Sequence, residues 1–407
     1  MVPPNRDVSR RVSRPTRRRF IRAAGVSTTL GPIGSLQADG FTLTAYEGDG
    51  DQPSTATNAP VDIVYDPYEG VDWDTVGHHK CEFHNHVRGS MTEPADVVDL
   101  YHDLGYTVYA VAEHGTDPMA WPWTDFSSIG GSFEDRNPEA LDVVSFPACE
   151  FTVDEHVDSL FSTLTHADVD TGSIGDRWDQ SHEIIDRTDH YVPEEGGGLA
   201  VLAHPVLYYY YGASEAWERY QPDFETRTRE QGMLGLEVFN RGSILDQDLR
   251  LWDHLLTAFA PERMIWGFGV DDPREYALGS DVDVNWTTIL LDESEFDPTD
   301  QSESRRATAR AMTAGRTLLN RRQRWDPDRN DPATAPQVHA IDVDAEAGTI
   351  TIDATDHDGI GWVSNGGIVS TGETVELTDD HVPYIRAHLT NERGADTCTQ
   401  PFGLGSG

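Results

Sequence analysis

Short apolar runs that alternate with helix-patterned stretches are the feature of this sequence that most limits its fold. Eight runs of strand length follow one another along the middle of the chain, at 80–84, 106–112, 143–151, 157–162, 199–204, 233–239, 265–270 and 286–291. Stretches with helical spacing of apolar residues lie between several of them, at 94–104, 214–230 and 246–260. This alternation is typical of parallel strands joined by crossover helices. We therefore predict an α/β fold with functional residues at the C-terminal ends of the strands.

Imidazole and carboxylate side chains stand at these predicted strand ends. The first run leads into His84 and His86, and a strand places residues i and i+2 on one face, so these two can bind one cation together. The other strand-end residues of this kind are Glu113, His114, Glu150, His156, His204, Glu237, Asp271 and Asp272. A single histidine of this type is more often structural than a ligand, but so many buried charges would be costly unless they shared a cation. The mixture suits Zn, Mn or Fe and does not distinguish among them.

The sequence resembles the polymerase and histidinol phosphatase (PHP) family of metallophosphoesterases over about residues 78 to 318. The resemblance rests on strings in the order and spacing of that family: CEFHNH at 81–86, VAEHGT at 111–116, PACEFT at 147–152, EHVDSLF at 155–161, LAHP at 202–205, GLEVFN at 235–240 and GVDD at 269–272. It implies a distorted seven-stranded β/α barrel that holds two or three divalent metal ions.

The resemblance also implies a ligand set for each of two metals, with Glu150 bridging them. The first metal would be bound by His84, His86, Glu150 and an acid of the 271–272 pair, for which Asp272 is preferred over Asp271. The second would be bound by Glu150, His156 and His204. Substrate in this family is a phosphoester, so the resemblance predicts hydrolysis of small phosphomonoesters or nucleotides by a metal-bridging hydroxide.

Two departures from the family pattern concern the third metal. Arg274 stands where the family often has a histidine, and residues 88–90 read Arg-Gly-Ser in place of a Ser-Asp-Gly context. Of the ligands expected for a third metal, only His114 is clear. An arginine at position 274 or 88 would replace the third cation by binding a phosphate with its planar guanidinium. Pairing of Arg274 with a surface acid is an equally weighted alternative.

Three residues are candidates for direct catalytic roles, namely His114, Glu237 and Arg274. His114 is the candidate donor of a proton to the leaving alcohol, and Glu237 is also a candidate for orienting ligands. An amidohydrolase-type enzyme is a second hypothesis, but it often bridges its metals through a carbamylated lysine, and the sole lysine, Lys80, precedes the His-x-His pair. A third hypothesis is a secreted metal- or carbohydrate-binding module on a decayed barrel.

The excess of acidic residues limits the partners of the chain. The 407 residues include 71 Asp or Glu and 30 Lys or Arg, which gives a formal net charge of −41. This excludes a general basic surface for nucleic-acid backbones, so short ends are the only nucleic acid that we expect it to bind. Such self-repulsion is screened in molar salt, where the Debye length falls to about 3 Å. We therefore predict a halophilic protein with a small phosphoester as its substrate.

Changes in composition predict four segments. Residues 1–38 contain eight arginines and one acid, and the string TRRRFIR at 16–22 resembles a twin-arginine export signal, which implies the twin-arginine machinery as a partner and an extracytoplasmic or secreted location. Residues 39–70 are rich in turn formers and predict a linker. Residues 71–322 would form the barrel. Alternating strands separated by turns predict a small antiparallel β domain at 336–407.

Overall fold

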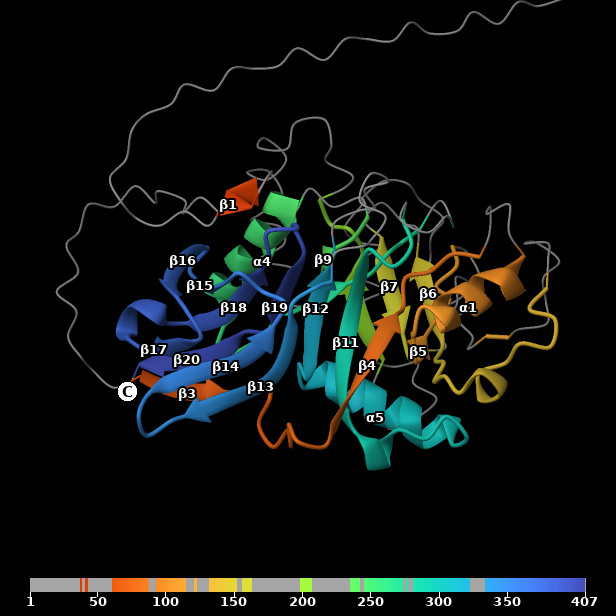
Figure 1. Ribbon diagram of the computed structural model, residues 1–407, viewed down its shortest axis with the longest axis horizontal. Helices are drawn as coiled ribbons and strands as arrows, with labels where there is room; N and C mark the ends of the chain where they lie inside the picture. The colour runs from red at the N-terminus through yellow and green to blue at the C-terminus, as the bar shows by residue number, and fades with distance from the viewer. Residues whose placement is uncertain are drawn as a thin grey trace, which may run out of the picture. The chain divides into compact units, whose positions relative to one another are not determined.

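The computed structural model divides into two units, residues 1–35 and 36–407, and the described residues all belong to the second. The structure describes residues 37–38, 41–42, 61–87, 93–114, 121–122, 132–151, 156–162, 198–206, 235–241, 245–273, 276, 281–322 and 334–406. Strands outnumber helices in this unit, so its fold is mixed α/β and strand-rich (Figure 1). The signal predicted at 1–38 lies almost wholly outside the described residues and stays a prediction.

One sheet has five strands in the order β10-β9-β8-β7-β6. Their bounds are β6 Ala148–Phe151, β7 Val157–Leu160, β8 Leu199–Leu202, β9 Gly235–Phe239 and β10 Trp266–Gly269. Strands β8, β9 and β10 run parallel, whereas β7 pairs antiparallel with both β6 and β8. Every residue of these five strands is buried, which explains why they appear in the sequence as largely apolar runs.

A larger sheet of ten strands follows the order β16-β15-β18-β19-β12-β11-β4-β5, with β20 paired to β18 and β3 paired to β20. Strands β4 and β5 run parallel, and the other pairs are antiparallel. The bounds are β3 Val61–Tyr65, β4 Val76–Glu82, β5 Val108–Tyr109, β11 Asn285–Asp292, β12 Thr317–Arg321, β15 Gly359–Ser364, β16 Gly367–Thr371, β18 Tyr384–Thr390, β19 Asp396–Thr399 and β20 Phe402–Ser406.

The remaining strands form two small sheets. β13 (Gln337–Asp344), β14 (Thr349–Thr355) and β17 (Thr374–Glu376) form an antiparallel sheet, in keeping with the alternation in the sequence. β1 (Gln37–Ala38) pairs with β2 (Phe41–Thr42). Strand pairing crosses two of the predicted segment boundaries. β3 lies within the predicted linker 39–70 and pairs with β20 of the predicted C-terminal domain. β19 of that domain pairs with β12 of the predicted barrel segment. The boundaries themselves stay predictions.

Three α-helices are described, α1 (Pro94–Asp103), α4 (Leu245–Phe259) and α5 (Gln301–Thr313), with short 3-10 helices at Glu139–Leu141, Glu293–Glu295 and Asp379–His381. The first two agree closely with the predicted helices 94–104 and 246–260, whereas 214–230 lies outside the described residues. Trp252 and Leu256 of α4 belong to the same apolar cluster as Leu236 of β9. Within the described residues, no helix is long and apolar enough to cross a membrane.

The seven-stranded β/α barrel is not confirmed, because the ladders among the described strands form open sheets. The antiparallel placement of β7 is the main difference from a regular alternation of parallel strands and helices. A sequence pattern could not reveal it, since a fully buried strand reads as an apolar run whichever way it points.

Two side chains connect β10 to the larger sheet in place of a backbone ladder. The hydroxyl of Thr287 accepts from Gly269 N–H at 3.1 Å and donates to Gly269 C=O at 2.9 Å. The side-chain amide of Gln400 makes the same pair of bonds with Gly267. Its oxygen accepts from Gly267 N–H at 3.1 Å, and its nitrogen donates to Gly267 C=O at 2.6 Å. A Cβ atom at Gly269 would lie 2.8 Å from the Trp286 carbonyl oxygen, so this close approach requires glycine. The residues that follow β10 are thereby fixed relative to β11.

Candidate metal centre

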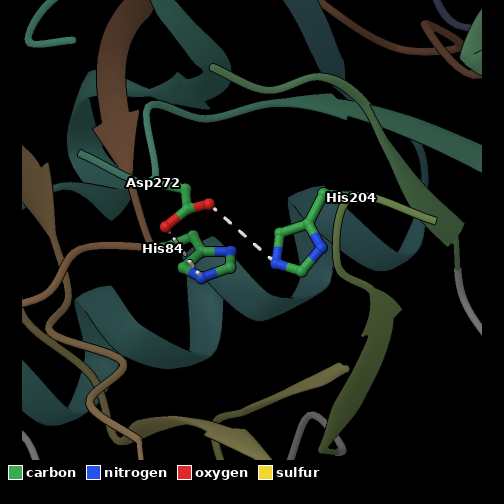
Figure 2. Close-up of side chains that lie close together, drawn as sticks. All are labelled: His84, His204 and Asp272. Carbon is green, nitrogen blue, oxygen red and sulfur yellow. Dashed lines mark ion pairs between the residues drawn. The ribbon is translucent and has the colours of Figure 1, made fainter. Parts of the chain in front are cut away.

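The structure brings the predicted ligands together from several strand ends. His84 and His86 follow β4, Glu150 lies in β6, and Asp272 follows β10. His156 immediately precedes β7, and His204 follows β8. All of these side chains are buried, whereas the side chain of His114 is 41% exposed. Figure 2 shows that His84, His204 and Asp272 point toward one another.

Three ligand atoms lie at the mutual spacing expected around one metal ion, and a carboxylate oxygen of Asp272 lies near two of them. His84 Nε2 and His86 Nε2 are 3.2 Å apart, and Glu150 Oε2 lies 3.3 Å from the first and 3.1 Å from the second. Asp272 Oδ1 lies 3.7 Å from His84 Nε2 and 3.5 Å from His86 Nε2. Ligand atoms about 2.0–2.1 Å from a tetrahedral zinc ion would be about 3.3 Å apart. His84, His86 and Glu150 therefore fit a divalent cation in both chemistry and spacing, and Asp272 forms a further group of this kind with His84 and His204.

Glu150 presents one oxygen to each of two histidine groups. Its Oε2 faces His84 and His86 and also lies 2.7 Å from His114 Nδ1. Its Oε1 pairs with His156 Nδ1 and lies 3.1 Å from His204 Nε2. A carboxylate arranged in this way can bridge two cations. His114, Glu150 and His156 form a second group with the spacing of metal ligands.

The surrounding charges keep Glu150 ionised. Burial alone would raise its pKa, but His84 and the hydrogen-bonding imidazoles of His114, His156 and His204 lower the pKa well below its usual value. Burial would likewise lower the pKa of His84, yet the neighbouring carboxylates, led by Asp158 and Glu237, raise it well above the usual value. The negative potential of this cluster thus favours positive charge, whether from protons or from metal ions.

Glu237 contacts two of the candidate ligands, His84 and His204. It is fully buried in β9, and its Oε1 lies 2.6 Å from His84 Nδ1. Its Oε2 accepts from His204 N–H at 2.6 Å and from the Asn240 amide at 2.9 Å. Burial raises the pKa of Glu237 to about 7. These contacts orient two candidate ligands, and the catalytic role suggested for Glu237 stays a prediction.

Asp271 lies outside the cluster, although it was among the candidate ligands. One carboxylate oxygen accepts from the backbone N–H groups of Val284 and Asn285, both at 2.9 Å. The other accepts from Asp283 N–H at 2.5 Å and from the Tyr101 hydroxyl at 3.0 Å. Because these donors engage both oxygens, Asp271 fixes the backbone of residues 283–285, and the acid of the pair that faces the histidines is Asp272.

Sequence reasoning missed two charged residues of the cluster. Asp158 is fully buried in β7, and its Oδ2 lies 3.3 Å from His84 Nδ1. Arg241 Nη2 lies 3.2 Å from Asp272 Oδ2. The i+2 spacing of Asp158 from His156 was an available signal, whereas nothing in the sequence marks Arg241. The other guanidinium candidates, Arg274 and Arg88, lie outside the described residues.

Two of the candidate ligands have backbone conformations that are rare outside glycine. His204 has a φ of 31° and Asp272 a φ of 42°. Such conformations cost about 1–3 kcal/mol each and concentrate at functional sites. Hydrogen bonds hold both, from His204 N–H to Glu237 and from Asp272 N–H to the His84 carbonyl at 3.1 Å.

Comparison with known proteins adds a distant likeness. No protein-family model matches the chain, and no curated protein matches it. Among solved structures, the chain is similar to a two-domain protein from Bacteroides vulgatus ATCC 8482 that contains a predicted PHP-like metal-dependent phosphoesterase. The identity is 14% and the TM-score 0.39, over 86% of this chain and 91% of that chain. So distant a likeness leaves the chemistry of this chain to be judged from its own residues.

Proposed function

We propose that this chain is a metal-dependent phosphoesterase that acts on small phosphomonoesters or nucleotides. The observation that carries the proposal is the placement of Glu150, whose two oxygens face separate groups of imidazoles. One cation would be held by His84, His86, Glu150 and Asp272. A second would be held by Glu150, His156 and His204, with His114 adjacent.

The protein residues around these cations have distinct roles in the proposed reaction. When bound, divalent cations at these residues would supply Lewis acidity and would activate a water for attack on the phosphoester. Glu150 contacts both groups of imidazoles and so fixes them relative to one another. Glu237 fixes the orientation of the His84 ring through Nδ1. His114 is the most exposed imidazole of the group, which supports a role as the proton donor to the leaving alcohol.

The position of Lys80 counts against the amidohydrolase hypothesis. Its ammonium group pairs with Asp283, and it lies 4.2 Å from the ring centroid of Tyr106 and 4.7 Å from that of Trp286. The sole lysine is thus held by an acid and two aromatic rings, while a glutamate faces both groups of imidazoles.

A distorted barrel is part of the proposal. Isolated parallel bridges pair Val108 with Val144 and His114 with Glu150, which link the β5 side of the large sheet to β6. At the other end, the Thr287 and Gln400 side chains connect β10 to β11 and β12. These links support a ring of strands around the candidate centre, closed in part by side chains.

Metal content and hydrolysis test the proposal together. Elemental mass spectrometry of the wild-type protein in molar potassium chloride should find two Zn, Mn or Fe ions per chain, and fewer in His84→Ala. Hydrolysis of a phosphomonoester panel should disappear with a chelator and return with the metal. Absence of retained metal after supplementation would contradict the proposal and favour a binding module on a decayed barrel.

We also propose that the chain is exported by the twin-arginine route and functions outside the cytoplasm in concentrated salt. The arginine-rich string at 16–22 and the net charge of −41 support this. Fusion of residues 1–38 to a reporter should direct its export, and replacement of Arg17 and Arg18 by lysine should block it. Export of the doubly substituted fusion would refute the assignment.

A further inference from the structure

Glu82 connects two chain segments that carry candidate ligands of one cation. It is the last residue of β4 and is fully buried. Its Oε1 accepts from His84 N–H at 2.8 Å, and its Oε2 accepts from Asp271 N–H at 2.8 Å. One carboxylate therefore holds the backbone beside both His84 and Asp272.

A third hydrogen bond completes this connection. Asp272 N–H donates to the His84 carbonyl at 3.1 Å. Strand β4 pairs with β11 and β5, whereas β10 pairs with β9, so no backbone ladder between described strands links the segments after β4 and β10. The Glu82 carboxylate and the bond from Asp272 to His84 take the place of such a ladder.

The connection also holds a strained residue. Asp272 has a φ of 42°, in the left-handed region, and must keep this conformation for its carboxylate to face His84 and His86. Side chains that orient ligands in this way commonly change metal affinity by about 10- to 100-fold when they are replaced.

We propose that Glu82 is a positioning residue that sets the separation of His84 from Asp272, and so determines the affinity of the cation that these two ligands share. The inference rests on the proposed metal centre. It assigns to Glu82 no contact with substrate or cation. The hydrogen bonds of Glu82 go to the backbone of His84 and Asp271 and not to His156 or His204, so we expect the second cation to depend less on this connection.

Glu82→Gln tests the proposal with a nearly identical shape. An amide keeps one acceptor but turns an N–H group toward a backbone N–H, so one of the two bonds must be lost. We expect one cation to bind about 10- to 100-fold more weakly while the other keeps its affinity. Titration with Co²⁺ against a competing chelator measures both affinities, and the visible absorption of Co²⁺ should change for the weakened site alone.

Asp253→Asn is the matched control, since it makes the same change in another buried carboxylate. Asp253 pairs with Arg386 and Tyr384, away from the histidines. We expect this variant to unfold at a lower temperature while both cation affinities and the Co²⁺ spectrum stay as in the wild type. Equal weakening of both cations in Glu82→Gln would indicate a general structural role and overturn the proposal.

Glu82→Asp decides the question if Glu82→Gln does not fold. It keeps the charge but withdraws the carboxylate by one carbon–carbon bond, about 1.5 Å. We expect it too to weaken one cation selectively. Wild-type affinities in a folded Glu82→Asp or Glu82→Gln protein would overturn the positioning role while leaving the metal centre intact. A wild-type protein that binds no Co²⁺ would instead overturn the proposed function, and this inference with it.

Discussion

The negative charges of buried acids face different kinds of partner at the candidate metal centre and at the C-terminal strands. At the centre, the contacts of Glu150 are imidazoles, at distances such as 3.1 Å to His204 and 2.7 Å to His114. At the C-terminal strands, Asp253 of the earlier helix α4 accepts two hydrogen bonds of 2.9 Å from Arg386 of β18. One region thus surrounds its acid with groups that are usually neutral, and the other with a permanent cation.

The contrast is weaker for a second acid in each region, because both of these acids contact an arginine. Asp272 faces His84 and His86, and a single guanidinium nitrogen of Arg241 lies near its other oxygen. Asp396 contacts Arg321 at 2.7 Å and His388 at 3.1 Å, and although burial would raise its pKa, these partners lower it. A buried acid must be paired or must coordinate a metal. The C-terminal acids are paired, and the acids of the centre have the arrangement of ligands.

The largest expected effect is on cation binding at the metal centre alone. Glu150→Gln removes the carboxylate that faces both imidazole groups, so we expect both cations to bind more than about 100-fold more weakly, beyond the loss caused by a supporting residue. Binding of a cation at 100 times its dissociation constant should stabilise the wild-type protein by about 2.7 kcal/mol. Thermal unfolding with and without metal should show this gain in the wild type and not in the variant.

An equal gain from metal in both proteins would contradict the bridging role of Glu150. Asp396→Asn is a suitable control, because it removes a buried acid of the C-terminal region. Its stability should be lower than that of the wild type, and its response to metal should be unchanged.

The next largest effect is a loss of stability in the region of paired acids alone. Arg386→Met leaves Asp253 buried without its bidentate partner, which should lower the free energy of unfolding by about 3–5 kcal/mol. Tyr384 remains as a donor at 3.0 Å and keeps part of the compensation. Chemical denaturation measures the loss. Metal content per folded chain should stay at the wild-type value, and a fall in metal content would mean that the two regions are not independent.

Much of the candidate site could be anticipated because its ligands stand at the ends of apolar runs. His84 and His86 share one face of an extended segment, Glu150 lies in β6, and His156, His204 and Asp272 precede or follow buried strands. The structure places all of them in one cluster. Local sequence suffices here because both the strand ends and the preferred ligand types are visible residue by residue.

The residues that support the cluster could not be anticipated, because their roles depend on contacts between distant segments. Glu82 acts on Asp271, 189 positions away, and Asp158 of β7 acts on His84, which follows β4. The antiparallel direction of β7 was missed for the same reason, since buried strands look alike in either direction. A pattern within one segment carries no information about its partner.

A smaller loss of stability is expected from a substitution that weakens the contact of β10 with the larger sheet. Gln400→Leu leaves the N–H and C=O of Gly267 buried without the amide that bonds to both. Loss of stability should be about 1–3 kcal/mol, the cost of leaving a buried polar group without its partner. Denaturant unfolding provides the measurement. A stability equal to that of the wild type would show that this side-chain link is not needed to hold β10.

The smallest effect should come from an exposed ion pair, which sharpens the comparison by showing that burial is what matters. Arg310 of α5 lies 3.2 Å from Glu295 and 3.3 Å from Glu303, and its side chain is 48% exposed. Water and salt already compensate these charges, so Arg310→Ala should change the free energy of unfolding by less than about 1 kcal/mol, and by still less in concentrated salt. Denaturant unfolding at low and high potassium chloride tests this. A loss as large as that of Arg386→Met would mean that ion pairing itself, rather than its burial, sets the difference between the paired acids and the acids of the metal centre.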